Sequence, residues 1–397
     1  MQKFIALAIS AQIGLITIGA AGQARAATNT EAYGYIDRTG KLTIAANFDE
    51  ASEFSEGLAA VKIGGKYGYV DKTGQMQIAP TFDTAKPFKN GLAAVISNEN
   101  DVRLYGYIDT TGRVVIPAAF ESANPFSEGV AAVKFTCSKE NGVTSDTQWG
   151  YIDKTGKTVI KPAFAQAEDF QKGLAVVYSG QKAGAIDRDG TFAVKPAYQM
   201  LLANSDNTFS VLKTSGPAMS LVGFGYNWLV SGGLFGFVDS KGKTLIKPTY
   251  DGASSFSEGL ACVTTGEGAK GGQPRNWLYI DESGTKKIDG KFSFGLPFAE
   301  GLAPVAKGRW QNSGMTPALV SAKWGFIDKK GKTVVPLNFD EAHPFSCGMA
   351  RVVADGKSGY VDHDGKIAIE PKFSDADDFS EDLAVVKTTR SAATKTE

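Results

Sequence analysis

Residues 67–95 read YGYVDKTGQMQIAPTFDTAKPFKNGLAAV, and versions of this stretch recur along the chain. Nine times an aspartate is followed, twenty residues later, by a Gly-Leu-Ala-like step. These aspartates are Asp37, Asp71, Asp109, Asp153, Asp187, Asp239, Asp281, Asp328 and Asp362. A fixed period is typical of repeat architectures, in which each unit buries its apolar face against its neighbours. We therefore predict one array of nine units of about 34 residues.

Each unit is expected to begin with a β-hairpin. Residues 67–71 alternate between large and small side chains, as on a strand with two faces. Residues 71–74 follow as the turn, in which the Asp71 carboxylate accepts backbone N–H bonds and Gly74 supplies a positive φ. The returning strand is expected to end at Pro80. The repeated aspartates are therefore interpreted as turn formers rather than as catalytic acids or bases.

Two further columns of the repeat predict a shared core. An aromatic residue stands eleven residues after every repeated aspartate: Phe48, Phe82, Phe120, Phe164, Tyr198, Tyr250, Phe292, Phe339 and Phe373. Every unit also ends in valine: Val61, Val95, Val133, Val177, Val211, Val263, Val305, Val352 and Val386. Full burial of each such side chain stabilises the fold by roughly 1.5–3 kcal/mol. The aromatic column is thus expected to be structural rather than a cofactor site.

These motifs resemble the WG-repeat (KWG-repeat) family of bacterial proteins. The dipeptide that gives the family its name occurs as Trp149-Gly150 and Trp324-Gly325, and other units replace tryptophan by tyrosine or phenylalanine. The departures are Ala183-Gly184, Ser358-Gly359 and Trp277-Leu278. The resemblance implies a repeat module and supplies no established catalytic residues.

All variation in unit length falls at one place. Each unit spans 29 residues from its first residue to its final valine, and the connections between units have 5, 9, 15, 5, 23, 13, 18 and 5 residues. A connection as short as five residues predicts that the Gly-Leu-Ala segment pairs with the next aromatic-Gly segment as an antiparallel hairpin. The longer connections must then emerge on one face, which is the usual binding surface of a repeat protein.

The ends of the array predict closure. The chain begins with an aromatic-Gly segment at Tyr33 and ends with residues 382–386, and these are the two halves of the same hairpin. Pairing them would close an all-β, β-propeller-like ring and remove two exposed strand edges. Nine blades exceed the usual four to eight, so an open β-solenoid or superhelical array is the alternative. The Phe-x-x-Ala-x-x-Phe spacing also suggests that the fourth element of each unit is irregular.

Outside the array, residues 1–26 read as a secretory signal peptide that ends in Ala24-Arg25-Ala26. An uncleaved membrane anchor is the alternative, because residues 4–21 are largely apolar. Residues 27–32 form a short segment, the repeats occupy 33–387 with starts near 33, 67, 105, 149, 183, 235, 277, 324 and 358, and residues 388–397 are expected to be a disordered tail. The predicted location is periplasmic or secreted, in a bacterium.

Charge, hydropathy and cysteine content argue against a nucleic-acid-binding protein, a further membrane span and a disulfide-stabilised fold. The whole chain has 42 basic and 42 acidic residues, and loss of residues 1–26 would leave a net charge of −2. That balance gives no electrostatic footprint for nucleic acid, and no further apolar run is long enough for a stable membrane span. Three cysteines without a CxxC pair argue against a disulfide framework. Cys262 is expected to be a small apolar filler, and Cys137 to lie in a loop.

No residue outside the repeat pattern forms a known catalytic motif. His343 precedes a proline and His363 occupies a turn, and neither accompanies a nucleophile or a metal-spaced cluster. The turns at 187–190 and 362–365 each contain two aspartates, which is too few oxygens for a calcium site. We therefore predict no catalytic residue, no metal and no cofactor.

The long connections are the candidate binding residues. The 23-residue connection carries Phe224, Tyr226 and Trp228, and the 18-residue connection carries Arg309 and Trp310. Exposed aromatics beside an arginine suit a protein or cell-envelope glycan partner. Alternatively, the long loop folds back and covers the divergent fifth unit. The leading hypothesis is a non-enzymatic scaffold.

Two other classes remain open. One is an envelope polymer hydrolase that uses the loop carboxylates Asp146, Glu267 or Glu99. The other is a structural or assembly protein.

Overall fold

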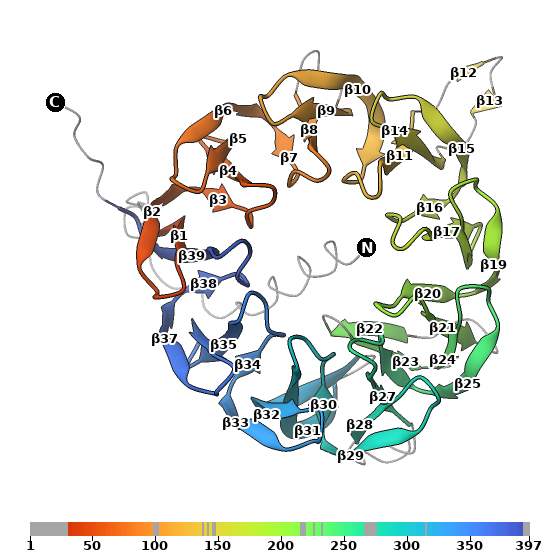
Figure 1. Cartoon of the computed structure of the whole chain (residues 1–397), viewed down its shortest axis with the longest axis vertical. Coiled ribbons are helices and arrows are strands. Elements are labelled where there is room, and N and C mark those ends of the chain that lie inside the picture. The colour runs from red at the N-terminus through yellow and green to blue at the C-terminus, as the bar shows by residue number, and fades with distance from the viewer. Residues whose placement is uncertain are drawn as a thin grey trace, which may run out of the picture.

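The computed structural model describes residues 31–97, 103–136, 139–140, 143–144, 148–214, 220–224, 227–231, 233–265, 276–313 and 316–391. These residues form short antiparallel strands grouped into small sheets, and the sheets stand around a ring (Figure 1). In most blades the shortest strand lies on the inner side of the ring, and the seven- to ten-residue strands form its rim (Figure 1). The chain is therefore all-β and propeller-like, as predicted.

Over the described ranges the strands make nine blades, each named from its inner to its outer strand. Blade 1 is β38 (Asp375–Ala376), β39 (Ala384–Thr389), β1 (Glu31–Ile36) and β2 (Leu42–Phe48); blade 2 is β3 (Glu50–Ala51), β4 (Leu58–Ile63), β5 (Lys66–Asp71) and β6 (Met76–Phe82); blade 3 is β7 (Thr84–Ala85), β8 (Leu92–Ile96), β9 (Tyr105–Asp109) and the first part of β10 (Val114–Ala123). Blade 4 is the last part of β10, β11 (Val130–Phe135), β14 (Trp149–Asp153) and β15 (Thr158–Phe164); blade 5 is β16 (Gln166–Ala167), β17 (Ala175–Ser179), β18 (Lys182–Ile186) and β19 (Phe192–Tyr198); blade 6 is β20 (Met200–Ala203), β21 (Phe209–Thr214), β24 (Gly233–Val238) and β25 (Thr244–Tyr250). Blade 7 is β26 (Gly252–Ser254), β27 (Ala261–Thr264), β28 (Trp277–Ile280) and β29 (Lys286–Phe292); blade 8 is β30 (Phe294–Gly295), β31 (Leu302–Ser313), β32 (Thr316–Asp328) and β33 (Thr333–Phe339); blade 9 is β34 (Glu341–Ala342), β35 (Ala350–Ala354), β36 (Lys357–Val361) and β37 (Ile367–Phe373). Two extra hairpins are β12 (Lys139–Glu140) with β13 (Val143–Thr144), and β22 (Ser220–Phe224) with β23 (Asn227–Ser231).

The hairpin predicted across each unit boundary is present. In blade 2, β4 ends one unit and β5 begins the next, and they pair from Leu58 with Asp71 to Ile63 with Lys66. The first and last strands of the array pair in the same way, from Glu31 with Thr389 to Ile36 with Ala384. The two ends of the chain therefore complete one blade between them, as the ring prediction requires (Figure 1).

The close approach of the outer strand explains the glycine of the aromatic-Gly dipeptide. A Cβ on Gly68 would lie 2.4 Å from the Ile78 carbonyl oxygen and 2.8 Å from the Pro80 nitrogen. The prediction that Pro80 ends this strand is wrong, because β6 continues to Phe82. Its partner register shifts between Tyr67 and Tyr69, and proline is tolerated at such an irregularity on an edge strand.

The blades share an aromatic core. Tyr69 of blade 2 meets Phe88 of blade 3 with ring centroids 4.7 Å apart, and the Tyr69 hydroxyl donates to the Lys86 carbonyl oxygen at 2.8 Å. Equivalent pairs recur at most of the other junctions, for example Tyr360 with Phe379. Each unit thus buries its large side chains against the next blade.

The fourth element of each unit, which the spacing predicts to be irregular, contains a short strand. In most blades it is a strand of only two or three residues, such as β7, followed by an extended segment that carries the buried Phe88.

The C-terminal boundary differs from the prediction. The tail predicted from residue 388 is ordered as far as Ser391, because β39 runs to Thr389 and the next two residues bind the outer strand of blade 1. Arg390 forms an ion pair with Asp49 at 3.0 Å, and the Ala46 N–H donates to the Ser391 hydroxyl at 3.0 Å.

In the part of the chain that the structure describes, no helix has the length and apolar character of a membrane span.

Candidate functional site

The ring has two different faces. In blades 2–9 the second strand leads into the third at one end of the strands, as at Gly64-Gly65, and we call the face at this end of the blades the hairpin-loop face. The turns between third and fourth strands, such as 71–74, lie at the other end together with the tight turns that precede each second strand. We call this the turn face.

On the turn face each repeated aspartate accepts hydrogen bonds within its own turn. Asp37 Oδ1 accepts hydrogen bonds from the Thr39 N–H at 2.9 Å, the Thr39 hydroxyl at 2.6 Å and the Lys41 N–H at 3.2 Å. The Thr39 hydroxyl bond is the main reason that the pKa of Asp37 is held below its usual value. Asp187 accepts the N–H groups of Asp189 and Thr191 in the same manner. These carboxylates therefore form turns, as predicted.

A second ring of contacts on the turn face joins neighbouring blades. Glu56 has a φ of 55°, a conformation that costs energy for a residue other than glycine. Its carboxylate accepts the N–H groups of Asn90 at 2.6 Å and Gly91 at 2.8 Å in the next blade. The backbone of Glu56 is thus strained within its own blade, while its side chain accepts two hydrogen bonds from the next blade.

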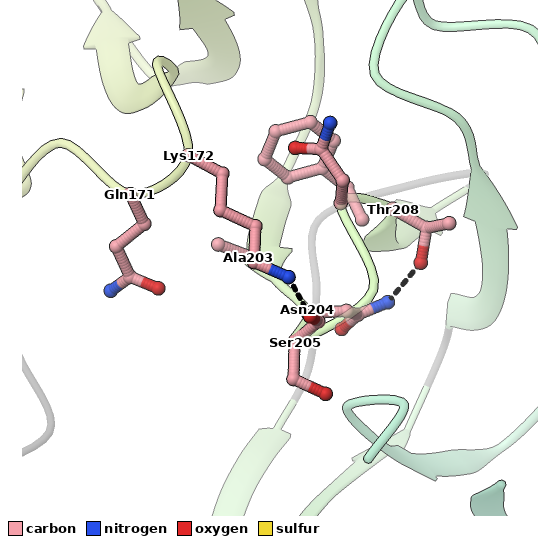
Figure 2. A pocket seen from close by; sticks show the side chains of 8 residues that line it. Gln171, Lys172, Ala203, Asn204, Ser205 and Thr208 are labelled. Carbon is pink, nitrogen blue, oxygen red and sulfur yellow. Dashed lines mark hydrogen bonds between the residues drawn. The ribbon is translucent and has the colours of Figure 1, made fainter. Parts of the chain in front are cut away.

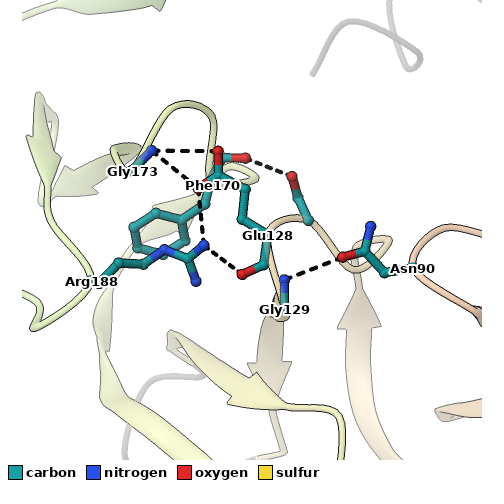
Figure 3. A network of polar contacts seen from close by, with 7 residues as sticks. Asn90, Glu128, Gly129, Phe170, Gly173 and Arg188 are labelled. Carbon is teal, nitrogen blue, oxygen red and sulfur yellow. Dashed lines mark hydrogen bonds and ion pairs between the residues drawn. The ribbon is translucent and has the colours of Figure 1, made fainter.

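Figure 3 shows the equivalent contact between blades 4 and 5. The Gly173 N–H donates to Glu128 at 3.1 Å, and Arg188 pairs with the same carboxylate at 2.9 Å (Figure 3). The Arg188 guanidinium also lies 4.6 Å from the centre of the Phe170 ring. His363 has the corresponding place in the last unit, stacked on Phe345 and 3.2 Å from Glu300. The histidine therefore serves as a junction residue.

The junction between blades 5 and 6 departs from this plan. The aromatic pair found at other junctions is replaced by Ala185 and Asn204, and Phe209 stands where the other eight units have alanine. Phe209 is 3% exposed and packs in one cluster with Ala185, so its ring fills space that the missing pair leaves. The buried Phe209 ring thus replaces part of the side-chain volume that the missing aromatic pair would occupy.

A small pocket lies at the same junction (Figure 2). Asn204 is 5% exposed, donates to the Thr208 hydroxyl at 2.8 Å and accepts from the Ser210 hydroxyl at 3.0 Å. Lys172 projects from blade 5 and donates to the Ser205 carbonyl oxygen (Figure 2). Two of these three bonds join residues that line the pocket, and the one from Lys172 crosses the junction between the blades.

The hairpin-loop face carries one cross-strand row per blade, made of one residue from each of the three inner strands. From blade 1 to blade 9 the rows are Asp375–Lys387–Tyr33, Glu50–Lys62–Tyr67, Thr84–Ile96–Tyr105, Ser122–Lys134–Trp149, Gln166–Tyr178–Ala183, Met200–Leu212–Phe235, Gly252–Thr264–Trp277, Phe294–Ala306–Trp324 and Glu341–Val353–Ser358. Rows in blades 1, 2 and 4 contain lysine, whereas those in blades 6–8 contain no charged residue and are almost entirely buried. The 23-, 13- and 18-residue connections belong to these same three blades. The three apolar rows thus all lie in blades with long connections, although the 15-residue connection belongs to blade 4, whose row contains Lys134.

The candidate residues from the sequence lie in these long connections. Trp310 is partly buried, packs against the core of its own blade and donates from Nε1 to the Ser293 carbonyl oxygen at 2.9 Å. Arg309 beside it is exposed. The backbone of Phe224 belongs to β22 and that of Trp228 to β23, which pairs with inner strand β26 of blade 7. Tyr226 lies outside the described residues.

The remaining titratable candidates have structural environments. Cys262 is buried in β27, as predicted, and burial raises the pKa of its thiol. His343 contacts the Arg351 guanidinium at 2.7 Å, and Arg351 approaches Asp378 of blade 1 at 3.6 Å. Among the described residues no group of three or more His, Cys, Asp or Glu is placed to hold a metal ion. Cys137 and the loop carboxylates Asp146, Glu267 and Glu99 lie outside the described ranges.

Sequence reasoning missed the cross-strand rows. Lys62 and Lys387 stand immediately after the final valines of their units, and the acids opposite them stand seventeen residues after a unit begins. These columns vary between units, so only the strand register shows that they meet each other.

The fold and its repeated turn define a propeller-like repeat protein. A model described as the WG-containing repeat matches residues 33–67, 67–100, 105–135, 149–182, 235–267, 277–309, 324–357 and 359–388. These segments cover more than half of the sequence, and the chain belongs to the WG-containing repeat family. They leave out residues 183–234, which hold the divergent fifth unit and the longest connection.

No curated protein sequence matches the chain. Among solved structures it is similar to one titled the eukaryotic initiation factor, with 10% identity and a TM-score of 0.44 over 83% of this chain and 97% of that one. It is also similar to the tricorn protease, with 11% identity and a TM-score of 0.36 over 77% of this chain and 37% of that one. An acylaminoacyl peptidase of Pyrococcus horikoshii matches with 11% identity and a TM-score of 0.35 over 78% of this chain and 59% of that one.

Proposed function

We propose that this protein is an exported, non-enzymatic scaffold that binds a protein or an envelope glycan through its hairpin-loop face. Support for export comes from the signal-peptide pattern of residues 1–26. Support for a binding role comes from the separation between a constant frame and variable connections that all emerge on one face. A scaffold needs this division, because the frame holds the contact residues in fixed positions.

The observation that carries the proposal is the anchoring of the hairpin formed by β31 and β32. Beyond the blade, this hairpin continues past a register shift between Lys307 and Arg309 to the pair Ser313 and Thr316. Three hydrogen bonds tie it to Ser293: the Gly308 N–H donates to the hydroxyl at 3.1 Å, the hydroxyl donates to the Gly308 carbonyl oxygen at 2.7 Å, and Trp310 donates to the Ser293 carbonyl oxygen. A preordered projection with an exposed Arg309 loses little conformational entropy on binding.

A non-enzymatic role is favoured by the use of the acidic residues. The repeated aspartates serve their turns, because the Oδ1 atoms of Asp37 and Asp187 accept two or three N–H or O–H hydrogen bonds there. The alternatives, an envelope polymer hydrolase or an assembly protein, have no described residue that favours them.

Capture from envelope extract tests the binding role. The bait is residues 27–397, compared with a variant in which connection 212–234 is replaced by the five-residue connection 353–357, and with Arg309→Ala. We expect the same partner to be retained by the wild type and depleted with at least one variant. Lys154→Ala, an exposed change on the turn face, is the matched control and should retain the partner.

Folding must be checked because β23 pairs with β26, so the shortened variant can lose stability. Circular dichroism and small-angle scattering separate that loss from a loss of contact, and Arg309→Ala leaves the hairpin intact. Equal capture by all four baits would overturn the proposal. Export is tested separately by finding a mature N-terminus after Ala26 in the periplasmic fraction or the medium.

A further inference from the structure

Two neighbouring rows on the hairpin-loop face have the same chemistry. In blade 2, Lys62 Nζ lies 2.7 Å from Glu50 Oε1 and 5.2 Å from the centre of the Tyr67 ring, and the Tyr67 hydroxyl donates to Glu50. In blade 1, Lys387 Nζ lies 5.6 Å from the centre of the Tyr33 ring, and the Tyr33 hydroxyl donates to Asp375 at 3.3 Å. Each row therefore presents a carboxylate, an ammonium and a phenol side by side.

Both rows are open to solvent. The connection above the blade 2 row is Gly64-Gly65, and a Cβ on either glycine would meet no atom within 4 Å. In blade 1 no hairpin connection joins the second and third strands, because they are the two ends of the array. The Glu50 side chain is 52% exposed and that of Lys62 27% exposed, and both tyrosines are half-buried. The buried rows of blades 6–8 have no such access.

The arrangement continues in a modified form over the next two blades. In blade 3, Lys86 Nζ lies 5.2 Å from the centre of the half-buried Tyr105 ring. In blade 4, Lys134 pairs across the strands with half-buried Trp149 and forms an ion pair with Glu121 at 3.0 Å. A lysine therefore lies beside an aromatic ring in each of four consecutive blades, and in blade 3 the Lys86 ammonium also donates to the Ala123 carbonyl oxygen at 2.6 Å.

This pattern favours a neutral polymer of sugars. Acid and lysine balance in the rows of blades 1 and 2, so the rows exert no net attraction on a polyanion. Carboxylates and ammonium groups bond sugar hydroxyls, and the C–H face of a pyranose packs on an aromatic ring. Repetition from blade to blade matches a ligand that itself repeats. A protein partner would instead need a well-packed apolar centre, which these rows lack.

We propose that the rows of blades 1 and 2, continued by blades 3 and 4, are successive subsites for a neutral polysaccharide chain. This rests on the proposed function, since it names the ligand class for the same face. Lys62 and Lys387 lie over the rings in the free protein, and their flexible stems let a sugar replace the ammonium on the ring. The phenol hydroxyls remain donors over the working pH range, because burial, followed by the charge of Asp375, raises the pKa of Tyr33 to about 12.

Calorimetric titration of residues 27–397 with neutral oligosaccharides tests the subsites. The probes are cellohexaose, chitohexaose and maltohexaose, with the matching disaccharides and hyaluronan for comparison. We expect one of the neutral hexasaccharides to bind, and its disaccharide to bind at least about tenfold more weakly because it reaches fewer subsites. Glu50→Gln and Lys62→Met should each weaken hexasaccharide binding by about three- to tenfold, since each removes one charge-assisted bond.

Lys286→Met is the matched control, because Lys286 is an exposed lysine paired with Asp289 in a blade whose row is buried. Its binding should equal that of the wild type. The inference is overturned if no neutral hexasaccharide binds, if the disaccharide binds as well as the hexasaccharide, or if Glu50→Gln, Lys62→Met and Lys286→Met bind alike. Capture of an envelope partner that depends on Arg309 or on connection 212–234, together with no sugar binding, would leave the proposed function standing and remove this inference alone.

Discussion

Leu278 and Gly290 reverse the sizes found at the same two positions in the other blades. Eight units have glycine at the first position, where a Cβ would lie 2.4–2.7 Å from a carbonyl oxygen of the outer strand. Blade 7 has Leu278 there, and Gly290 occupies the outer-strand position that holds proline, alanine or leucine in the other units. A Cβ on Gly290 would lie 3.0 Å from the Trp277 carbonyl oxygen. The leucine is thus accommodated by a glycine on the strand that faces it.

This relationship predicts a coupled pair of substitutions. Gly290→Pro should lower the free energy of unfolding by about 1–3 kcal/mol, because it crowds a strand that already accommodates Leu278. Leu278→Gly combined with Gly290→Pro restores the pattern of the other blades and should recover much of that loss. Urea denaturation of the wild type, both single variants and the double variant measures the coupling. Additive effects of the two changes would contradict it.

Phe209 should be critical for the junction between blades 5 and 6. Phe209→Ala removes a buried ring where the aromatic pair of other junctions is already absent, so we expect a loss of about 3–5 kcal/mol. Phe192→Ala is the comparison, since Phe192 is an aromatic on the neighbouring β19 that is only partly buried. Equal urea midpoints for Phe209→Ala and the wild type would show that the ring fills no needed space.

The contact from Glu56 to the next blade can be separated from the strain in its own turn. Glu56→Ala removes both hydrogen bonds and keeps a non-glycine residue at positive φ, whereas Glu56→Gly removes the bonds and the strain together. We expect alanine to cost about 1 kcal/mol more than glycine at this position. Thermal unfolding of the two variants gives the difference. If both variants are as stable as the wild type, the carboxylate does not join the blades.

The turn aspartates predict loss of stability in acid. Threonine hydroxyl bonds are the main cause that lowers the pKa of four of these carboxylates, namely Asp37, Asp71, Asp109 and Asp153. Because the folded-state pKa values lie below the unfolded value of about 3.9, these groups favour the folded state above that pH. Their contribution disappears as the pH falls from about 4 through the folded-state values.

Urea midpoints measured from pH 7 to pH 2.5 test this expectation. Titration of the turn aspartates should change the urea midpoints little above pH 5 and should lower them below pH 4. Thr73→Val, which removes the hydroxyl bond to Asp71, should make the fall shallower. Thr81→Val, an exposed change on the outer strand, is the control. If the urea midpoint of Thr73→Val falls with pH as steeply as that of the wild type, the hydroxyl bond to Asp71 does not contribute to the loss of stability in acid.

The repeat alone was enough to predict most of the frame. The turn chemistry of Asp71 and Gly74 predicted the hairpin turn, and the five-residue connection after Val61 predicted the pairing of β4 with β5. The two unpaired halves at Tyr33 and 382–386 gave the closure of blade 1. These inferences succeeded because turns and short connections depend on residues that are close together in the sequence. The nine copies also show the common pattern even where single units depart from it.

Exceptions to the repeat could be seen in the sequence but not explained by it. Phe209 in a column of alanines and Gly290 in a column of larger residues are visible once the units are aligned. Their meaning depends on Ala185 and on Leu278, which they meet only through strand pairing and packing between blades. The Pro80 prediction failed for the same reason, because an outer edge strand tolerates what an inner strand would not.

The sequence by itself determined the array: its period, its turns, its closing pair and the single place where length varies. Only the tertiary structure decided what the hairpin-loop face presents. Two rows occupy equivalent places in blades 2 and 6, namely Glu50–Lys62–Tyr67 and Met200–Leu212–Phe235. The first is exposed beside the short Gly64-Gly65 loop, whereas the second is buried in a blade with a 23-residue connection. Burial and cross-strand register are properties of neighbouring strands, and a linear repeat does not encode them position by position.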